Sequence, residues 1–283
     1  MNIGIIGLGF VGGALKKYFH SKRIKLFLYD KYKNIGSVSE VDKSDIVFVC
    51  VPTPFHLKSG FDVSAVVDAI NLLKQPKIVV LKSSVLPGTT EKLQKHFPQH
   101  KILFNPEFLT EKRAYYDLTH PDRQILGWTQ KSKSVAKKVL SILPASANGL
   151  VMGSPEAEMV KYMANAFLAL KVVYANQFSD LCKKLKINYS VVAKGTGLDK
   201  RIGLSHLNVK DGGYRGYGGS CFPKDVNSII QLAKVNKVDF KLLGMVRELN
   251  KKYLKHSGLT EEYFLTNLHK HNQQKLKLTN LRM

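Results

Sequence analysis

The chain opens with the stretch that decides its fold, since residues 2–13 read NIGIIGLGFVGG. A short apolar run at 2–6 is followed by Gly-x-Gly-x-x-Gly and then by a helical pattern to about residue 22. The next apolar run, 24–29, ends at Asp30, which is about the spacing expected between such a glycine turn and a following acidic residue. This context predicts a dinucleotide-binding turn in a doubly wound, Rossmann-type α/β domain.

Each glycine of this motif has a separate physical role. Gly7 permits the tight turn, Gly9 lets a pyrophosphate approach the backbone, and Gly12 allows the helix to pack closely on the strand. The helix N-terminus then faces the phosphates. Asp30 is placed to accept hydrogen bonds from ribose hydroxyls, and its charge would repel a 2′-phosphate. We therefore predict NAD as cofactor, although the nearby Lys31 and Lys33 leave NADP open.

Further apolar runs rich in β-branched residues extend this pattern. They lie at 45–51, 77–82, 101–104 and 124–127, and helical spacing at 62–74 and 131–143 separates them. Alternation of this kind is typical of a parallel sheet covered on both faces. We assign residues 1–152 to this NAD-binding domain.

The pattern becomes helical from residue 153 onward. A long helix is predicted over 155–185, with Ser154 as N-cap, Pro155 at the first helical position and Glu156 and Glu158 in the first turn. Its length fits a helix that joins two domains or builds a dimer interface. Shorter helices are predicted at 188–195, 223–236 and 239–255. Residues 153–256 are thus an all-helical central domain, and 257–283 a polar, basic tail with weak helical character.

Composition bounds the class of protein. The 283 residues include 44% hydrophobic residues, but no apolar run approaches the roughly 20 residues that span a bilayer. The apolar start lacks a basic segment and carries glycines at motif spacing, so it is not interpreted as a signal peptide. The cysteines, Cys50, Cys182 and Cys221, are odd in number and widely spaced. That argues against a disulfide framework or a metal cluster and favours a reducing, cytoplasmic setting.

The formal net charge of +23 suggests an anionic partner. The lysines are spread along the chain, however, and no nucleic-acid-binding motif accompanies them. We favour a lysine-rich solvated surface over a nucleic-acid interface. Attraction of a phosphate-bearing substrate fits either interpretation.

Three further positions could carry chemistry. Cys221 follows a glycine-rich loop and precedes Lys224 and Asp225, and a nearby ammonium would favour a reactive thiolate. A cysteine is, however, more often a buried small hydrophobe, as we expect for Cys50 and Cys182. Lys161 and Asn165 share a helix face, where a lysine either serves a site or extends to solvent. Glu107 follows a strand and would alone be an ordinary loop acid.

Eight blocks of the sequence resemble the UDP-glucose/GDP-mannose dehydrogenase family, and they occur in the order that the family has. They span about residues 1–250: GLGFVGG at 7–13, CVPTP at 50–54, KSSVLPGTT at 82–90, NPEFL at 105–109, HPDRQILG at 120–127, AEMVKYMANAFLALK at 157–171, GLDKRIG at 197–203 and GYGGSCFPKDV at 216–226. One block would be weak evidence, but eight in family order are highly specific.

The resemblance implies oxidation of a sugar primary alcohol to a carboxylate with reduction of two NAD. Cys221 would hold the aldehyde as a thiohemiacetal that becomes a thioester, and water would release the acid. Lys161 would stabilise the oxyanion. Asn165 and Asp225 would hold this lysine and a water, and Glu107 would serve thioester hydrolysis.

Further residues take roles by the same resemblance. Arg201 would reach the substrate of a neighbouring subunit, so a homodimer is implied. The nucleotide-sugar substrate would be UDP-glucose or a relative, with no nucleic-acid or membrane partner. Cofactor contacts are expected from Gly7, Gly9, Phe10, Val11, Gly12, Asp30, Val51, Pro52, Thr53, Ser84 and Glu111. Substrate contacts are expected from Phe108, Leu109, Lys161, Asn165, Arg201, Tyr217, Gly218 and Lys224, and Ser84 is also a catalytic candidate.

Two features depart from the family pattern. Ser84 stands where the family usually has threonine, which keeps a hydroxyl. Family members also normally continue into a second α/β domain that closes over the nucleotide half of the substrate. Only about 30 residues follow the helix ending near Lys255, too few for this domain. We expect either that the chain is a fragment, that a second polypeptide supplies the domain, or that this is a minimal form.

Two other functions remain open from the sequence. A two-electron 3-hydroxyacid-type dehydrogenase has the same glycine motif and a lysine–asparagine pair on a long helix, but no need for the Cys221 thiol. A degenerate NAD-binding or scaffold protein would have lost turnover together with the second domain. The intact set Glu107, Lys161, Asn165, Cys221 and Asp225 argues against this last alternative.

Overall fold

The computed structural model describes residues 1–210 and 212–266. The chain forms two compact units. Unit 1 comprises Met1–Thr53 and Asp62–Lys161, and unit 2 comprises Pro54–Phe61 and the described residues from Tyr162 onward. No helix of the described part combines the length and apolar content needed to cross a membrane.

Unit 1 is built on a seven-stranded sheet of order β2-β1-β3-β6-β7-β8-β9. The first five strands in this order are parallel, while β8 runs antiparallel to β7 and β9 parallel to β8. The bounds are β1 Ile3–Ile6, β2 Leu26–Tyr29, β3 Ile46–Val49, β6 Ile78–Leu81, β7 Lys101–Phe104, β8 Gln124–Trp128 and β9 Gly149–Gly153. All residues of β1 and β3 are buried, as expected for strands covered on both faces.

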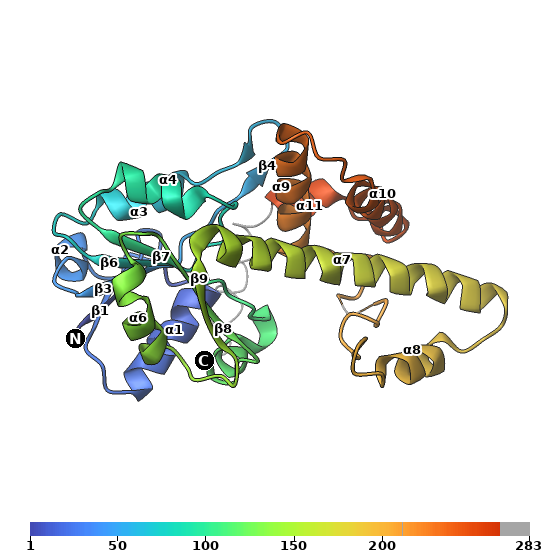
Figure 1. Ribbon diagram of the computed structural model, residues 1–283. Coiled ribbons are helices and arrows are strands. Elements are labelled where there is room, and N and C mark those ends of the chain that lie inside the picture. Colours follow the sequence, from blue (N-terminus) through green and yellow to red (C-terminus); the bar gives the residue numbers. More distant parts are fainter. Residues whose placement is uncertain (211, 267–283) are drawn as a thin grey trace. The chain divides into compact units, whose positions relative to one another are not determined.

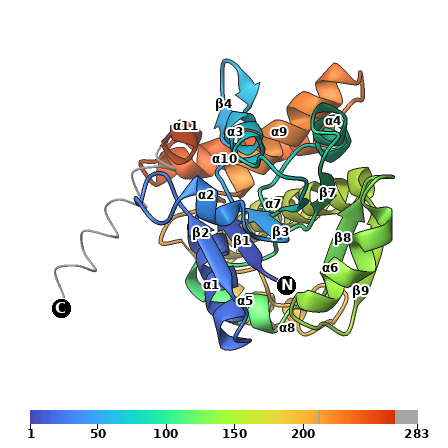
Figure 2. The same cartoon turned by 90° about the vertical axis from the view of Figure 1, so that its left-hand side faces the viewer.

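Helices cover both faces of this sheet. Figure 1 shows α1 and α6 on one face and α3 and α4 on the other, and Figure 2 shows the same layers after a quarter turn. The helices are α1 Phe10–Ser21, α2 Val38–Val41, α3 Ser64–Asn71, α4 Thr89–His96, α5 Ala114–Thr119 and α6 Ala136–Ile142, with 3-10 turns η1 Glu111–Arg113 and η2 Lys133–Val135.

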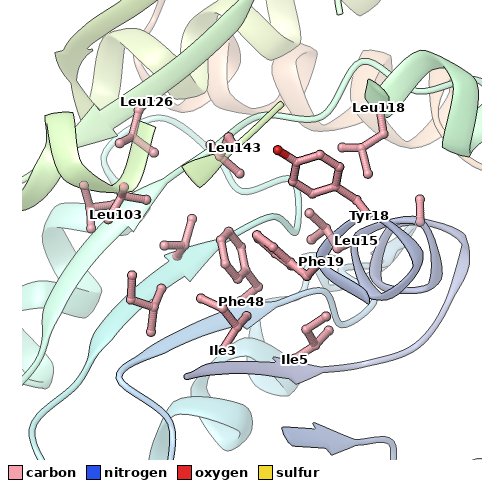
Figure 3. Packing of buried hydrophobic residues seen from close by; sticks show 14 of the residues in the cluster. Ile3, Ile5, Leu15, Tyr18, Phe19, Phe48, Leu103, Leu118, Leu126 and Leu143 are labelled. Carbon is pink, nitrogen blue, oxygen red and sulfur yellow. The ribbon is translucent and has the colours of Figure 1, made fainter. Parts of the chain in front are cut away.

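The core on the α1 side joins the sheet to three helices. α1 contributes Leu15 and Phe19, whose side chains are fully buried against β1 and β3, and α5 and α6 add Leu118 and Val139. The Phe19 and Phe48 ring centroids lie 5.3 Å apart (Figure 3). Each such side chain contributes about 1.5–3 kcal/mol on full burial, so α1 is held mainly by this apolar face.

Unit 2 is mainly helical. Most of the long helix α7, Ser154–Lys184, belongs to it, together with α8 Tyr189–Gly197, α9 Phe222–Val235, α10 Lys241–His256 and α11 Glu261–Thr266. A hairpin of β4 Phe55–His56 and β5 Gly60–Phe61 packs against α9, where the Gln231 side chain lies beside Gly60. Glu261 is buried and ties α11 to α9 through Asn227 and to α10 through Arg247.

The predicted Rossmann-type sheet and helical central region are confirmed. The structure adds the reversed direction of β8 and β9, the hairpin 55–61, and the helices α2, α4, α5 and α11. One local prediction was wrong, because α7 begins at Ser154 itself, and the buried Ser154 hydroxyl has no hydrogen-bond partner among the described residues. The domain boundaries at 152 and 256 stay predictions, and the tail beyond residue 266 lies outside the described residues.

Candidate active site

The parallel strands of unit 1 bring four functional segments to one edge of the sheet. Gly7 follows β1, Cys50 follows β3, Lys82 follows β6 and Asn105 follows β7, and these strands are neighbours in register. The carboxyl ends of parallel strands are where open α/β sheets bind their ligands. The sequence therefore places its motif residues at the edge where chemistry is expected.

The glycine turn has the shape that a pyrophosphate requires. Gly7 has φ +87°, and a Cβ at Gly12 would lie 1.9 Å from the Gly7 carbonyl oxygen, so neither position accepts a side chain. A Cβ at Gly9 would meet nothing within 4 Å, which leaves the turn open. Gly9 is also the N-cap of α1 and has no side-chain cap, so the first N–H groups, including those of Phe10 and Val11, are free for a phosphate. These residues fit a dinucleotide.

The Asp30 carboxylate is fixed beside this turn. Its Oδ2 accepts from the Leu8 N–H at 2.7 Å, and its Oδ1 accepts from the N–H groups of Tyr32 and Lys33 at 3.0 Å. The Lys33 ammonium donates to the Leu8 carbonyl at 2.5 Å. The Asp30 carboxylate is thus held in one orientation next to the glycine turn, and the Lys33 ammonium is bound to the same turn.

The segments after β3 and β6 are joined to each other. The Thr53 hydroxyl donates to the Ser84 carbonyl at 2.8 Å, and the Ser83 hydroxyl donates to the Val51 carbonyl at 2.6 Å. Pro52 lies between these two contacts in the chain. Glu111, another expected cofactor contact, opens the η1 turn.

A buried ion pair joins Lys161 on α7 to Glu107. The Lys161 ammonium donates to the Glu107 carbonyl at 2.6 Å and to Oε1 at 3.0 Å, and the Leu109 N–H donates to Oε2 at 2.9 Å. Both side chains are almost fully buried. The Phe108 ring lies 5.6 Å from this ammonium and 3.9 Å from the Arg123 guanidinium. Lys161 therefore faces inward and does not extend to solvent.

Unit 2 holds the second group of predicted residues. Cys221 is the N-cap of α9; it is partly exposed and forms no disulfide within the described part of the chain, and its Sγ lies 3.5 Å from the Ser220 hydroxyl. One helical turn later the buried Asp225 accepts from the Asn165 amide and from the Lys224 ammonium, each at 2.5 Å. Lys224 also lies over the Phe61 ring of the hairpin, at 5.7 Å. The structure thus brings together Cys221, Asp225, Lys224 and Asn165 from α9 and α7.

The glycine-rich loop before Cys221 is held by α10. The Asn250 side-chain oxygen accepts from the Tyr217 N–H at 2.6 Å, and its amide donates to the Tyr217 carbonyl at 2.9 Å. Gly218 follows directly, where a Cβ would press on Tyr214 and Phe264. Sequence reasoning missed Asn250, because its partner lies 33 residues away.

Arg201 lies in an exposed turn of unit 2. Its side chain is 89% exposed and pairs with Asp199. The buried Lys171 on α7 donates to the carbonyls of Ile202 and Gly203 at 2.7 and 2.9 Å, and so anchors this turn. A guanidinium held outward in this way is available to a molecule outside the chain.

The geometry defines a Rossmann-type dinucleotide-binding unit followed by a helical unit that presents a thiol at a helix N-terminus. Residues 25–143 match the NAD binding domain of the UDP-glucose/GDP-mannose dehydrogenase family, and residues 155–252 match its central domain. The chain belongs to this family, and its N-terminal unit is an NAD-binding domain.

Individual relatives agree with this assignment. UDP-glucose 6-dehydrogenase of Rickettsia prowazekii is 34% identical over 231 residues, which cover 78% of this chain and 52% of the relative. UDP-glucose 6-dehydrogenase YwqF of Bacillus subtilis is 35% identical over 219 residues, covering 74% and 49%. A UDP-glucose dehydrogenase structure from Pyrobaculum islandicum superposes with a TM-score of 0.80 at 28% identity, covering 90% of this chain and 68% of that one. The chain spans about half the length of the curated relatives it matches.

Proposed function

We propose that this protein oxidises the primary alcohol of a nucleotide sugar, UDP-glucose or a close relative, to the uronic acid in two NAD-linked steps. The observation that carries the proposal is Cys221, a partly exposed thiol at the start of α9, one turn before the buried Asp225–Asn165 pair, in a chain that also has an NAD-binding domain. A two-electron dehydrogenase has no use for such a thiol. The names of the relatives support the substrate class.

The glycine turn and Asp30 would hold the cofactor, with Phe10, Val11, Val51, Pro52, Thr53, Ser84 and Glu111 as further contacts. NAD, when bound, accepts a hydride in each oxidation. The first oxidation removes a hydride and a proton from the alcohol and leaves an aldehyde.

Cys221 then retains the reactive aldehyde. Its thiolate forms a carbon–sulfur bond to the aldehyde carbon, and the resulting thiohemiacetal loses a second hydride and a proton to become a thioester. Asp225, held by Asn165 and Lys224, keeps a fixed negative charge one turn from the thiol, where it orients a water or a proton donor.

Lys161 and Glu107 supply charge for the remaining steps. The ammonium stabilises the oxyanion that develops on the sugar carbon. The Glu107 carboxylate takes a proton from the water that attacks the thioester, and the carbon–sulfur bond breaks to return the Cys221 thiolate. The sum is one alcohol and one water converted to a carboxylate, with two hydrides transferred to two NAD and three protons released.

We also propose a homodimer built on α7. An exposed apolar stripe follows one face of this helix at spacings of three, four and seven residues, as in helix–helix interfaces. It consists of Met163, Phe167, Tyr174, Phe178 and Leu181, with Leu185 directly after the end of the helix, each 42–72% exposed. A second copy would cover this stripe and bring Arg201 to a neighbouring substrate. The three cysteines form no disulfide among the described residues, and this together with the nucleotide-sugar substrate suits the cytoplasm.

The test counts NADH per product with purified protein, NAD and a panel of nucleotide sugars. Two NADH per uronic acid support the proposal, whereas one NADH per product supports a two-electron dehydrogenase. The Cys221→Ser variant should lose acid formation. Measurable NAD binding without turnover of any sugar would contradict the proposed activity for this chain.

A further inference from the structure

Lys82 is a buried lysine to which the proposed mechanism gives no role. It follows β6 directly, and its side chain is 4% exposed. Its ammonium donates to the Asn105 side-chain oxygen at 2.8 Å. An ammonium is costly to bury, so a lysine at this depth needs a reason.

The surroundings of Lys82 are those of the candidate active site in unit 1. The pKa of Lys82 is lowered to about 8, mainly by burial, and the titratable groups that act on it are Cys50, Glu107 and Lys161. Burial raises the pKa of Cys50 to about 12, so this thiol is neutral. Among these groups Glu107 is the carboxylate; it pairs with Lys161 and its charge also acts on Lys82.

Asn105 connects Lys82 to Glu107. Its side-chain oxygen accepts from Lys82, and its amide donates to the Ile125 carbonyl of β8 at 2.6 Å. Asn105 is fully buried and stands two positions before Glu107 in the Asn-Pro-Glu segment. The proline fixes the backbone between them. The contacts that hold Asn105 therefore hold the start of the segment that carries the carboxylate.

We propose that Lys82 is a positioning residue that holds the Asn105–Leu109 segment, and with it the Glu107 carboxylate, in the orientation needed for thioester hydrolysis. This inference rests on the proposed function for its catalytic consequence. It has a structural consequence of its own as well, because the Leu109 N–H donates to Glu107 Oε2.

The chain offers a matched control at the other end of the same strand. Lys77 precedes β6 as Lys82 follows it, is also largely buried, and donates to the Asp42 carbonyl at 2.6 Å. A purely structural contribution of a buried lysine should therefore appear equally at both positions. A contribution to Glu107 should appear at Lys82 alone.

The experiment compares Lys82→Met and Lys77→Met in the full chain by rapid-quench kinetics with intact-protein mass spectrometry. We expect Lys82→Met to slow thioester hydrolysis about tenfold or more, so that the acyl-enzyme accumulates, while KM for NAD stays unchanged. Its Tm at neutral pH should stay level or rise, because an apolar side chain replaces a buried charge. Lys77→Met should show no acyl-enzyme accumulation.

Amide hydrogen exchange of the 105–110 segment provides a readout that does not need turnover. Exchange should become faster in Lys82→Met and stay at the wild-type rate in Lys77→Met. The Asn105→Leu variant, which removes the acceptor, should reproduce both effects, and this decides the question if Lys82→Met fails to fold. Unchanged hydrolysis and unchanged exchange in Lys82→Met would overturn the proposal. Failure of the wild-type protein to form any uronic acid would instead overturn the proposed function, with the exchange result still deciding the role of Lys82.

Discussion

Gly12 and Gly13 are neighbours in α1, but only at Gly12 does the surrounding backbone exclude a side chain. A Cβ at Gly12 would lie 1.9 Å from the Gly7 carbonyl oxygen, whereas a Cβ at Gly13 would meet nothing within 4 Å. The backbone of the turn, which cannot move aside like a flexible side chain, is what excludes a methyl group at Gly12. This contrast separates the glycine that the cofactor turn requires from one that merely occurs in a helix.

We therefore predict opposite effects of alanine at the two positions. Gly12→Ala should lower the free energy of unfolding by at least about 2 kcal/mol and abolish NAD binding. Gly13→Ala should raise it by up to about 1 kcal/mol, because alanine is the better helix former. Urea unfolding and NAD titration of the two variants check this, and equal stabilities would contradict the account of the turn.

Glu158 connects α7 to the start of α4. Its carboxylate accepts from the N–H groups of Gly88 and Thr90 and from the Thr90 hydroxyl. Burial raises the pKa of Glu158 to about 7. The folded state thus binds a proton that the unfolded chain, with an ordinary carboxyl pKa, releases at lower pH.

This shift predicts how stability depends on pH. The contribution is fully present below about pH 4.5 and is lost as the pH rises through about 7, so the free energy of unfolding should fall between pH 5 and 8 by about 3 kcal/mol from this group. Glu158→Gln should flatten that dependence. Denaturant titrations across this pH range measure it, and identical slopes in both proteins would show that Glu158 is not the responsible group.

At the scale of elements, α7 presents its apolar stripe to solvent over most of its length in unit 2. Phe178 lies within the stripe, and its ring centroid is 4.6 Å from that of Tyr174. Gln177 is its exposed neighbour outside the stripe. A glutamate at position 178 would therefore lie in the proposed interface, whereas a glutamate at position 177 would lie outside the stripe.

We expect Phe178→Glu to convert the dimer to a monomer, because a carboxylate would be buried without a partner in the interface. Gln177→Glu should leave the dimer intact. Sedimentation velocity at micromolar concentration distinguishes the two states. A dimer that persists in Phe178→Glu would place the subunit contact elsewhere.

Elements with a strong local pattern were predictable from the sequence, and those held by distant partners were not. The apolar runs at 45–51 and 77–82 correspond to β3 and β6, and the long periodic stretch to α7. By contrast, α4 has a polar sequence, and its N-terminus is capped by Glu158 from about 70 residues away. The hairpin 55–61 depends on α9, far along the chain, so no local signal indicates it.

The same division holds for the candidate site. Motif spacing indicated Gly7, Asp30, Glu107, Lys161 and Cys221, because their neighbours in sequence form recognisable blocks. Lys82 lies within such a block, yet its partner Asn105 is 23 residues away. Only the strand order β6-β7 brings the two side chains together. The signal in the sequence that could have indicated Lys82 is a lysine placed directly after a buried strand.

At the scale of the whole molecule, the charge of +23 acts on anionic ligands before they bind. NAD and nucleotide sugars carry phosphates, and long-range attraction is screened by salt. We predict that kcat/KM falls severalfold between about 50 and 200 mM salt while kcat changes little. Initial rates at the two ionic strengths test this, and a fall in kcat alone would argue against electrostatic steering.

Direct detection of a sugar attached to Cys221 tests the central claim most sharply. The Glu107→Gln variant, mixed with NAD and UDP-glucose and quenched in acid, should stall before hydrolysis, and tryptic peptide 216–224 should carry one uronyl group. The Glu107→Gln/Cys221→Ser double variant should give the unmodified peptide. An unmodified peptide from Glu107→Gln, together with two NADH per uronic acid formed by the wild-type protein, would contradict a thioester at Cys221.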